Sequence, residues 1–282
     1  LDFISGIDSS YKDDILNFNG SINEKYKNEI KILRNPYLNT EYLGFYLDSK
    51  NPQIQSKLLR RAFNIGFDRN KMIKYLRNSI GTPANGGFIP KALGDFNSIN
   101  GLKYNPKRAK ELIKKYKELS NDKYPSFTIS TTDNYLDICE FIQRELLDIG
   151  IEIKIEIMPG SALKSAKANG KTEIFRASWV ADYPDSQNFL SLFYSENFAP
   201  YGPNYTHFKN EKFDSIYESS FLETNDSLRS LMYKELDKII INEAPVVVLF
   251  YDEVIRFIGK NITGLGINQT NLLNLKQVKK SQ

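Results

Sequence analysis

A strand, a helix and a second strand follow one another directly between residues 127 and 157. Residues 127–130 form a short strand-like run, and apolar residues then recur at the 3.6-residue spacing of a helix from about residue 134 to 149. Gly150 stands where helices commonly end in a left-handed residue, and isoleucines at 151, 153, 155 and 157 then alternate with charged residues. This order predicts a βαβ unit, and therefore an α/β fold, or α+β with mixed sheets.

Further elements are expected on both sides of this unit. The almost wholly apolar run 245–251 is typical of a strand in the buried centre of a sheet. Cys139 falls on the apolar face of the 134–149 helix and is expected to be a small buried hydrophobe. Other strands are expected at 29–33, 41–47 and 173–180, and helices at 10–16, 52–67, 68–76, 106–119, 161–168, 185–194, 211–222 and 226–242.

Composition excludes several classes of protein. The 38 basic and 34 acidic residues give a formal net charge of +4, without the basic clustering that nucleic-acid binding needs. With Cys139 and His207 as the only residues of their kinds, an internal disulfide and a zinc site built on Cys and His are excluded, and His207 has no nucleophile motif around it. No cofactor or metal is expected. No apolar run approaches the roughly 20 residues of a membrane span.

The chain opens Leu1-Asp2-Phe3, without Met and without the basic start of a signal peptide. We therefore expect the sequence to be a processed or truncated piece of a longer protein.

One motif carries a family resemblance. Residues 174–185 read Ile-Phe-Arg-Ala-Ser-Trp-Val-Ala-Asp-Tyr-Pro-Asp, and residues 188–190 read Asn-Phe-Leu. This pattern, a strand that ends in Trp followed by two small residues, Asp, Tyr, a turn and a helix, closely resembles the family 5 extracellular solute-binding proteins. That group includes the oligopeptide- and dipeptide-binding proteins that serve ABC importers.

Other landmarks of the family occur in the same order along the whole chain. Residues 59–69 resemble its Arg-Ala helix pair that ends in Asp-Arg, and residues 104–110 resemble the start of an outer helix. Residues 147–151 resemble a helix end that leads into a strand, and residues 244–247 a strand near the carboxy terminus. Each motif is weak alone, but five in register are fairly specific.

The resemblance implies a piece of a two-lobed trap of the periplasmic-binding-protein type II kind. The family is considerably longer than this chain, so the chain is expected to be its carboxy-terminal portion. Residues 1–40 would be a remnant of the first lobe with the entering hinge, residues 41–248 the ligand-gripping second lobe, and residues 249–282 the segment that returns to the first lobe.

The resemblance also implies a function and a set of ligand-binding residues. The protein would be the substrate-binding component of an ABC importer and not an enzyme. The Asp aligned with Asp182 would accept the α-ammonium of a peptide, while the strand before it pairs with the peptide main chain. Trp179, Arg176, Ser178 and Tyr183 complete the expected site.

The residues themselves leave several roles open. Alternation along a strand places Arg176 and Ser178 on one face and Trp179 on the other, so a regular strand cannot turn both Arg176 and Trp179 into one cleft. Arg176 could meet a ligand carboxylate or form a structural ion pair, and Trp179 could be core or cleft. Asp182 could be only a turn residue, and Asp185 is expected to cap the following helix.

Two alternative functions are compatible with parts of the sequence. The same fold could bind a non-peptide solute, such as a nickel chelate, haem, an opine or a sugar. Asp182 and Asp185 could be the paired carboxylates of a hydrolase, but they lie only three residues apart without another acidic motif, and this reading is disfavoured. By the family's example the whole protein would be periplasmic or at the cell surface, either free or lipid-anchored. It would be monomeric and would deliver its ligand to a membrane permease.

Overall fold

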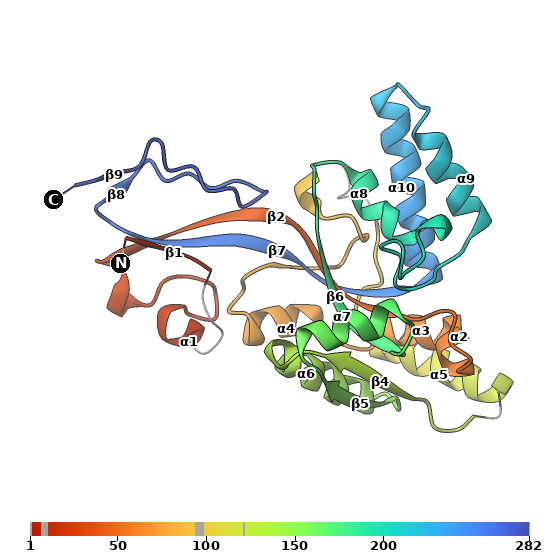
Figure 1. Ribbon diagram of the computed structural model, residues 1–282. Helices are drawn as coiled ribbons and strands as arrows, with labels where there is room; N and C mark the ends of the chain where they lie inside the picture. Colours follow the sequence, from red (N-terminus) through yellow and green to blue (C-terminus); the bar gives the residue numbers. More distant parts are fainter. Residues whose placement is uncertain (1, 7–10, 94–98, 121, 282) are drawn as a thin grey trace.

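A computed structural model describes residues 2–6, 11–93, 99–120 and 122–281. One mixed sheet runs through the molecule in the strand order β1-β7-β2-β6-β4-β5, with β3 paired to β7, and a small sheet joins β8 to β9. Both termini lie at one end of the molecule, and most helices gather at the other (Figure 1). The strands are β1 Phe3–Ser5, β2 Ile30–Phe45, β3 Thr82–Pro83, β4 Ser126–Thr131, β5 Glu152–Ile157, β6 Ile174–Val180, β7 Val246–Gly259, β8 Ile262–Thr263 and β9 Lys279–Lys280.

The predicted βαβ unit is confirmed. Strands β4 and β5 pair in parallel over their full lengths, from Ser126 with Glu152 to Thr131 with Ile157. Helix α6 connects them, and Gly150 after it has a φ of +92°.

The helices are α1 Lys12–Ile15, α2 Pro52–Gln55, α3 Lys57–Ile65, α4 Arg69–Leu76, α5 Pro106–Ser120, α6 Leu136–Leu147, α7 Gly160–Ala168, α8 Ser186–Leu190, α9 Glu211–Ser220 and α10 Asp226–Glu243. The short 3-10 turns are η1 Glu24–Tyr26, η2 Lys91–Leu93, η4 Asp133–Tyr135, η5 Ser191–Phe193 and η6 Ser195–Asn197.

The two strands expected at 29–33 and 41–47 are one continuous strand. β2 is 16 residues long and pairs with the 14-residue β7, which continues past the predicted end at residue 251. The sequence between the two predicted strands resembles a turn because it contains Pro36, which has no N–H to donate. The pairing register shifts between Pro36 and Thr40, so the irregularity accommodates the proline without ending the strand.

Side chains of alternate residues build a core on each face of the sheet. Leu43, Phe45 and Ile174 belong to one cluster, which α3 to α6 cover. Tyr42 and Phe175 belong to the other, which α8, α9 and α10 cover. Figure 1 shows α9 and α10 as a pair on one side of the central strands and α3, α5 and α6 on the other. Cys139 is 1% exposed in the first cluster, as predicted.

The turn after α4 attaches the amino-terminal segment to the helical end of the molecule. Asn78 and Ser79 both have positive φ values, of 49° and 56°, which non-glycine residues rarely adopt. The Asn78 amide donates to the carbonyl of Leu16 at 3.1 Å, and the Ser79 hydroxyl donates to that of Phe18 at 2.6 Å. These bonds hold a turn conformation that would otherwise be strained.

The expected domain boundaries at 40/41 and 248/249 fall inside β2 and β7. These strands pair with each other from Ile30–Gly259 to Gly44–Val246. Both boundaries therefore lie where the chain passes between the end that holds the termini and the end that holds most helices (Figure 1). The division into a first-lobe remnant, a second lobe and a return segment stays a prediction.

A buried carboxylate on α10 holds the loop that follows β3. Asp237 is fully buried and accepts hydrogen bonds from the backbone N–H groups of Phe88, at 2.6 Å, and Ile89, at 3.4 Å. A Cβ on Gly87 would lie 1.8 Å from the Asp237 Oδ2 atom, so residue 87 must be glycine for this approach. Burial raises the pKa of Asp237 to about 7, although the two hydrogen bonds oppose that shift.

This carboxylate makes stability depend on pH. Because the pKa of Asp237 is raised in the folded state, from 3.8 to about 7, the folded protein keeps a proton that the unfolded chain releases. We predict that the free energy of unfolding falls as the pH rises between about 4 and about 7, and that Asp237→Asn removes this part of the slope. Urea titrations at a series of pH values measure it. Asp148→Asn, at an exposed position, is the matched control, and an equal slope in wild type and Asp237→Asn would contradict the prediction.

Candidate ligand-binding site

The turn that follows β6 is fixed by one asparagine of α8. The Asn188 side-chain oxygen accepts a hydrogen bond from the Trp179 indole N–H at 2.8 Å and from the Asp182 backbone N–H at 3.4 Å. Asp185 accepts from the Gln187 backbone N–H at 2.8 Å, which confirms it as the predicted N-cap of α8. The strand end, the turn and the helix start are thereby held as one rigid unit.

The Asp182 carboxylate projects from this unit into solvent. The residue is exposed, and within the described residues its carboxylate has no hydrogen bond or ion pair. An ionised carboxylate held by a fixed backbone can accept charge-assisted hydrogen bonds from a cation without first breaking bonds of its own. Asp182 is thus available to an ammonium group.

The strand beside this carboxylate has an open edge. On one side β6 pairs with β2 along its whole length, from Ile174–Phe45 to Val180–Asn39. On the other side β4 pairs with β6 only at Ile174 and Phe175. Over 176–180 that edge has no strand partner among the described residues, and half of its backbone N–H and C=O groups point there. An extended chain could pair with this edge as an added strand.

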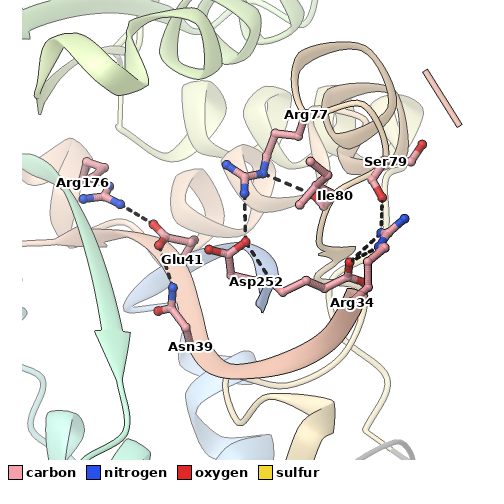
Figure 2. A network of polar contacts seen from close by, with 9 residues as sticks. Arg34, Asn39, Glu41, Arg77, Ser79, Ile80, Arg176 and Asp252 are labelled. Atoms are coloured by element: carbon pink, nitrogen blue, oxygen red, sulfur yellow. Dashed lines mark hydrogen bonds and ion pairs between the residues drawn. The ribbon is translucent and has the colours of Figure 1, made fainter. Parts of the chain in front are cut away.

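Arg176 is engaged in an ion pair. Its guanidinium Nη2 lies 2.6 Å from Glu41 Oε2, and the two side chains are 17% and 4% exposed. The other Glu41 oxygen accepts from the Asn39 amide at 2.9 Å (Figure 2). The guanidinium carbon of Arg176 lies 3.4 Å from the ring centroid of Tyr135. Of the two roles that the sequence left open for Arg176, the structure contains the ion pair.

A second and a third ion pair continue this network along β2 and β7. Arg77, just after α4, lies 2.9 Å from Asp252 on β7, and Arg34 on β2 contacts Glu253 on β7 at 2.5 Å (Figure 2). Arg34 also donates to the carbonyl of Ser79. Burial raises the pKa of Glu41, while the Arg176 charge lowers it. Each carboxylate in this network therefore has an arginine partner.

The other predicted site residues lie on both faces of β6. Trp179 packs against the α8–α10 core and Arg176 against Tyr135, so they occupy opposite faces, as the alternation predicted. Ser178 is half-buried opposite Glu41 on β2. Tyr183 is 46% exposed, and its hydroxyl contacts Gln187 on α8. Asp182, Ser178 and the open edge of β6 are thus brought together, whereas Arg176 and Trp179 point away from each other.

A lysine on the Trp179 face of β6 was not foreseen. The Lys167 ammonium of α7 lies 4.4 Å from the Tyr205 ring centroid and 6.0 Å from that of Phe175. Burial, with smaller contributions from Arg176 and Lys164, lowers the pKa of Lys167 to about 8. Across the described ranges, no group of three or more His, Cys, Asp or Glu residues could hold a metal ion.

Comparisons with known proteins show the family of the chain. Residues 9–200 match the family model described as bacterial extracellular solute-binding proteins, family 5, middle. The chain belongs to this family. Relatives include the dipeptide-binding protein DppE of Bacillus subtilis, 25% identical over 85% of this chain and 45% of its own length. The glutathione-binding protein GsiB of Salmonella choleraesuis is 28% identical over 86% of this chain and 48% of its own length.

Solved structures of periplasmic and oligopeptide-binding proteins share this fold. The periplasmic binding protein DppA of Helicobacter pylori, in complex with the peptide STSA, has a TM-score of 0.81 and 23% identity, and covers 100% of this chain and 53% of its own. AppA of Bacillus subtilis, in complex with a nonapeptide, has a TM-score of 0.79, 23% identity, and coverages of 100% and 56%. The family 5 chain described here therefore has the type II periplasmic-binding fold and spans about half the length of these relatives.

Among the described helices, none has the length and apolar character required to cross a bilayer. Relatives of family 5 are extracellular or periplasmic proteins.

Two residues of the site were missed from the sequence. Glu41 starts a predicted strand among apolar and aromatic residues, where a buried acid needs a cation, but one sequence does not show that Arg176 provides it. Asn188 belongs to the Asn-Phe-Leu run at residues 188–190, but the sequence predicted no role for its side chain. The signal available for it was its position nine residues after Trp179, on the first turn of the following helix.

Breaking the Glu41–Arg176 pair should destabilise the fold. Removing one partner from a buried pair leaves an uncompensated charge, which costs about 3–5 kcal/mol. We expect Arg176→Met to lower the free energy of unfolding by about 3 kcal/mol, and Glu41→Met combined with Arg176→Met to cost less than the sum of the two single substitutions. Urea unfolding of the four proteins measures the coupling. Additive effects would show that the two side chains do not stabilise each other.

Proposed function

We propose that this chain is the ligand-gripping lobe of a peptide-binding component of an ABC importer. Its site anchors the α-ammonium of a peptide on Asp182 and pairs the peptide main chain with the open edge of β6. The complete protein, which contains the rest of the first lobe, closes on the ligand and delivers it to a membrane permease. The proposal includes no catalytic step.

One observation carries this proposal. An unpaired, exposed carboxylate stands at the end of a strand whose 176–180 edge has no partner in the described residues. A peptide supplies the complement of both features, because its amino terminus is a cation and its main chain carries alternating donors and acceptors. Main-chain pairing does not depend on side chains, so one site can accept many sequences.

The ligands of the relatives support a ligand with a peptide main chain for this site. The relatives include a dipeptide-binding protein, a glutathione-binding protein, and structures in complex with the peptide STSA and with a nonapeptide. We extend this ligand class to the present chain. A non-peptide solute, such as a nickel chelate, haem, an opine or a sugar, would leave either Asp182 or the strand edge unused.

Localisation and assembly follow from the same family. We propose that the complete protein is periplasmic or at the cell surface, held there by a lipid anchor if the cell has no periplasm, and that it acts as a monomer. A hydrolase that uses Asp182 and Asp185 as a carboxylate pair is disfavoured, because Asp185 is occupied in capping α8.

The anchor is tested on the complete protein by calorimetric titration with tri- to pentapeptides. A hydrogen bond to a charged group contributes about 1.5–3 kcal/mol, so Asp182→Asn should weaken binding roughly 10- to 150-fold. Acetylating the peptide amine should weaken wild-type binding similarly and should add little in Asp182→Asn. Asp148→Asn, at an exposed position on another element, is the control. No binding of any free-amine peptide by the wild-type protein would contradict the proposal.

A further inference from the structure

The Arg176 guanidinium of the candidate site is already neutralised by a carboxylate of the protein itself, that of Glu41. Glu41 Oε2 lies 2.6 Å from Arg176 Nη2, and the Glu41 side chain is only 4% exposed. On the paired strands, Glu41 stands directly opposite Ser178, which is two residues from Arg176 on the same face of β6. The strand register therefore places the carboxylate where it can reach the guanidinium.

Further contacts fix the arginine in this position. The guanidinium carbon lies 3.4 Å from the Tyr135 ring centroid, so one of its flat faces is covered. The second Glu41 oxygen is occupied by the Asn39 amide at 2.9 Å. The Arg176 Nε is buried and has no hydrogen-bond partner in the described residues. The guanidinium is therefore held in place by burial and not by a full set of hydrogen bonds.

A ligand carboxylate at Arg176 would either meet the repulsion of Glu41, which already neutralises the guanidinium, or displace it. The displaced Glu41 would keep its buried position and lose its cation, a state that low-dielectric surroundings make costly. Arg77 cannot replace the lost cation without leaving Asp252, to which it is bound at 2.9 Å. Lys167 packs beside Phe175 and Tyr205, on the face of β6 opposite Arg176.

We infer that Glu41 is a specificity-determining residue, which prevents Arg176 from binding the carboxyl group of the ligand. The inference rests on the proposed function and narrows its ligand class. This lobe then recognises a peptide from its amino end, where Asp182 is free and Arg176 is not. At Arg176 it does not distinguish a free peptide acid from a C-terminal amide or from a peptide that continues further.

The test compares two ligands on each of three forms of the complete protein. Calorimetry gives the Kd of one tetrapeptide as free acid and as C-terminal amide, for wild type, Arg176→Met and Glu41→Gln. The ratio of amide to acid Kd is the readout, because a general folding defect changes both ligands alike and leaves the ratio unchanged. Lys209→Met, which removes one positive charge from an exposed position, is the control for long-range electrostatics.

We expect the ratio in Arg176→Met to stay within threefold of the wild-type ratio. In Glu41→Gln, which keeps the side-chain shape but releases the arginine charge, the ratio should shift at least fivefold in favour of the free acid. A wild-type ratio of tenfold or more that falls to about one in Arg176→Met would overturn the inference, since Arg176 would then bind the carboxylate. An unchanged ratio in Glu41→Gln would also overturn it.

Failure of the proposed function gives a different result. If no free-amine peptide binds wild type, or if acetylating the amine has no effect, the Asp182 anchor is wrong. If acetylation weakens binding and only the amide-to-acid ratios differ from those expected, the anchor stands and the role of Glu41 is wrong.

Discussion

The antiparallel pairing of β2 with β7 on one side and β6 on the other is the constraint on which the structure depends. β2 pairs with β7 from Ile30 to Gly44 and with β6 from Asn39 to Phe45. A single strand thus connects the end that holds both termini to the end that holds most helices and the candidate site. Because its register with β6 is fixed, β2 places Glu41 opposite Ser178, within reach of Arg176. The far edge of β6 has no strand partner over 176–180 in the described residues because β4 pairs only with Ile174 and Phe175.

The site combines a region of paired charges and a region without partners on the same strand. Toward the sheet, Glu41 pairs with Arg176 and accepts a hydrogen bond from Asn39, and Arg77 with Asp252 extends this buried network. Toward solvent, Asp182 and the backbone edge lack partners among the described residues. Buried charges that are paired stabilise a unique arrangement, whereas exposed groups without partners are available to a ligand. The boundary between the two regions lies within residues 176–182.

Local patterns predicted most of the fold. The βαβ unit, the cap at Asp185, buried Cys139 and the opposite faces of Arg176 and Trp179 depend on periodicity and turn chemistry within a few residues, and each is confirmed. Long-range pairing could not be read in the same way. Pro36 made β2 look like two strands, and the charged residues Asp252 and Glu253 made β7 look shorter than it is. Glu41 pairs with Arg176 across a sequence separation of 135 residues. The register between strands that are distant in the chain cannot be predicted from one sequence and is known only from the folded sheet.

Pairing of a peptide main chain with the open edge of β6 would protect the backbone amides of that edge from solvent. Hydrogen–deuterium exchange of the complete protein, with and without a tetrapeptide that carries a free amine, tests this pairing most directly. We expect the peptide to slow exchange of backbone amides within residues 176–180, and Asp182→Asn to require more peptide for the same protection. Protection of other segments, with residues 176–180 exchanging at the same rate in a saturated complex, would contradict it.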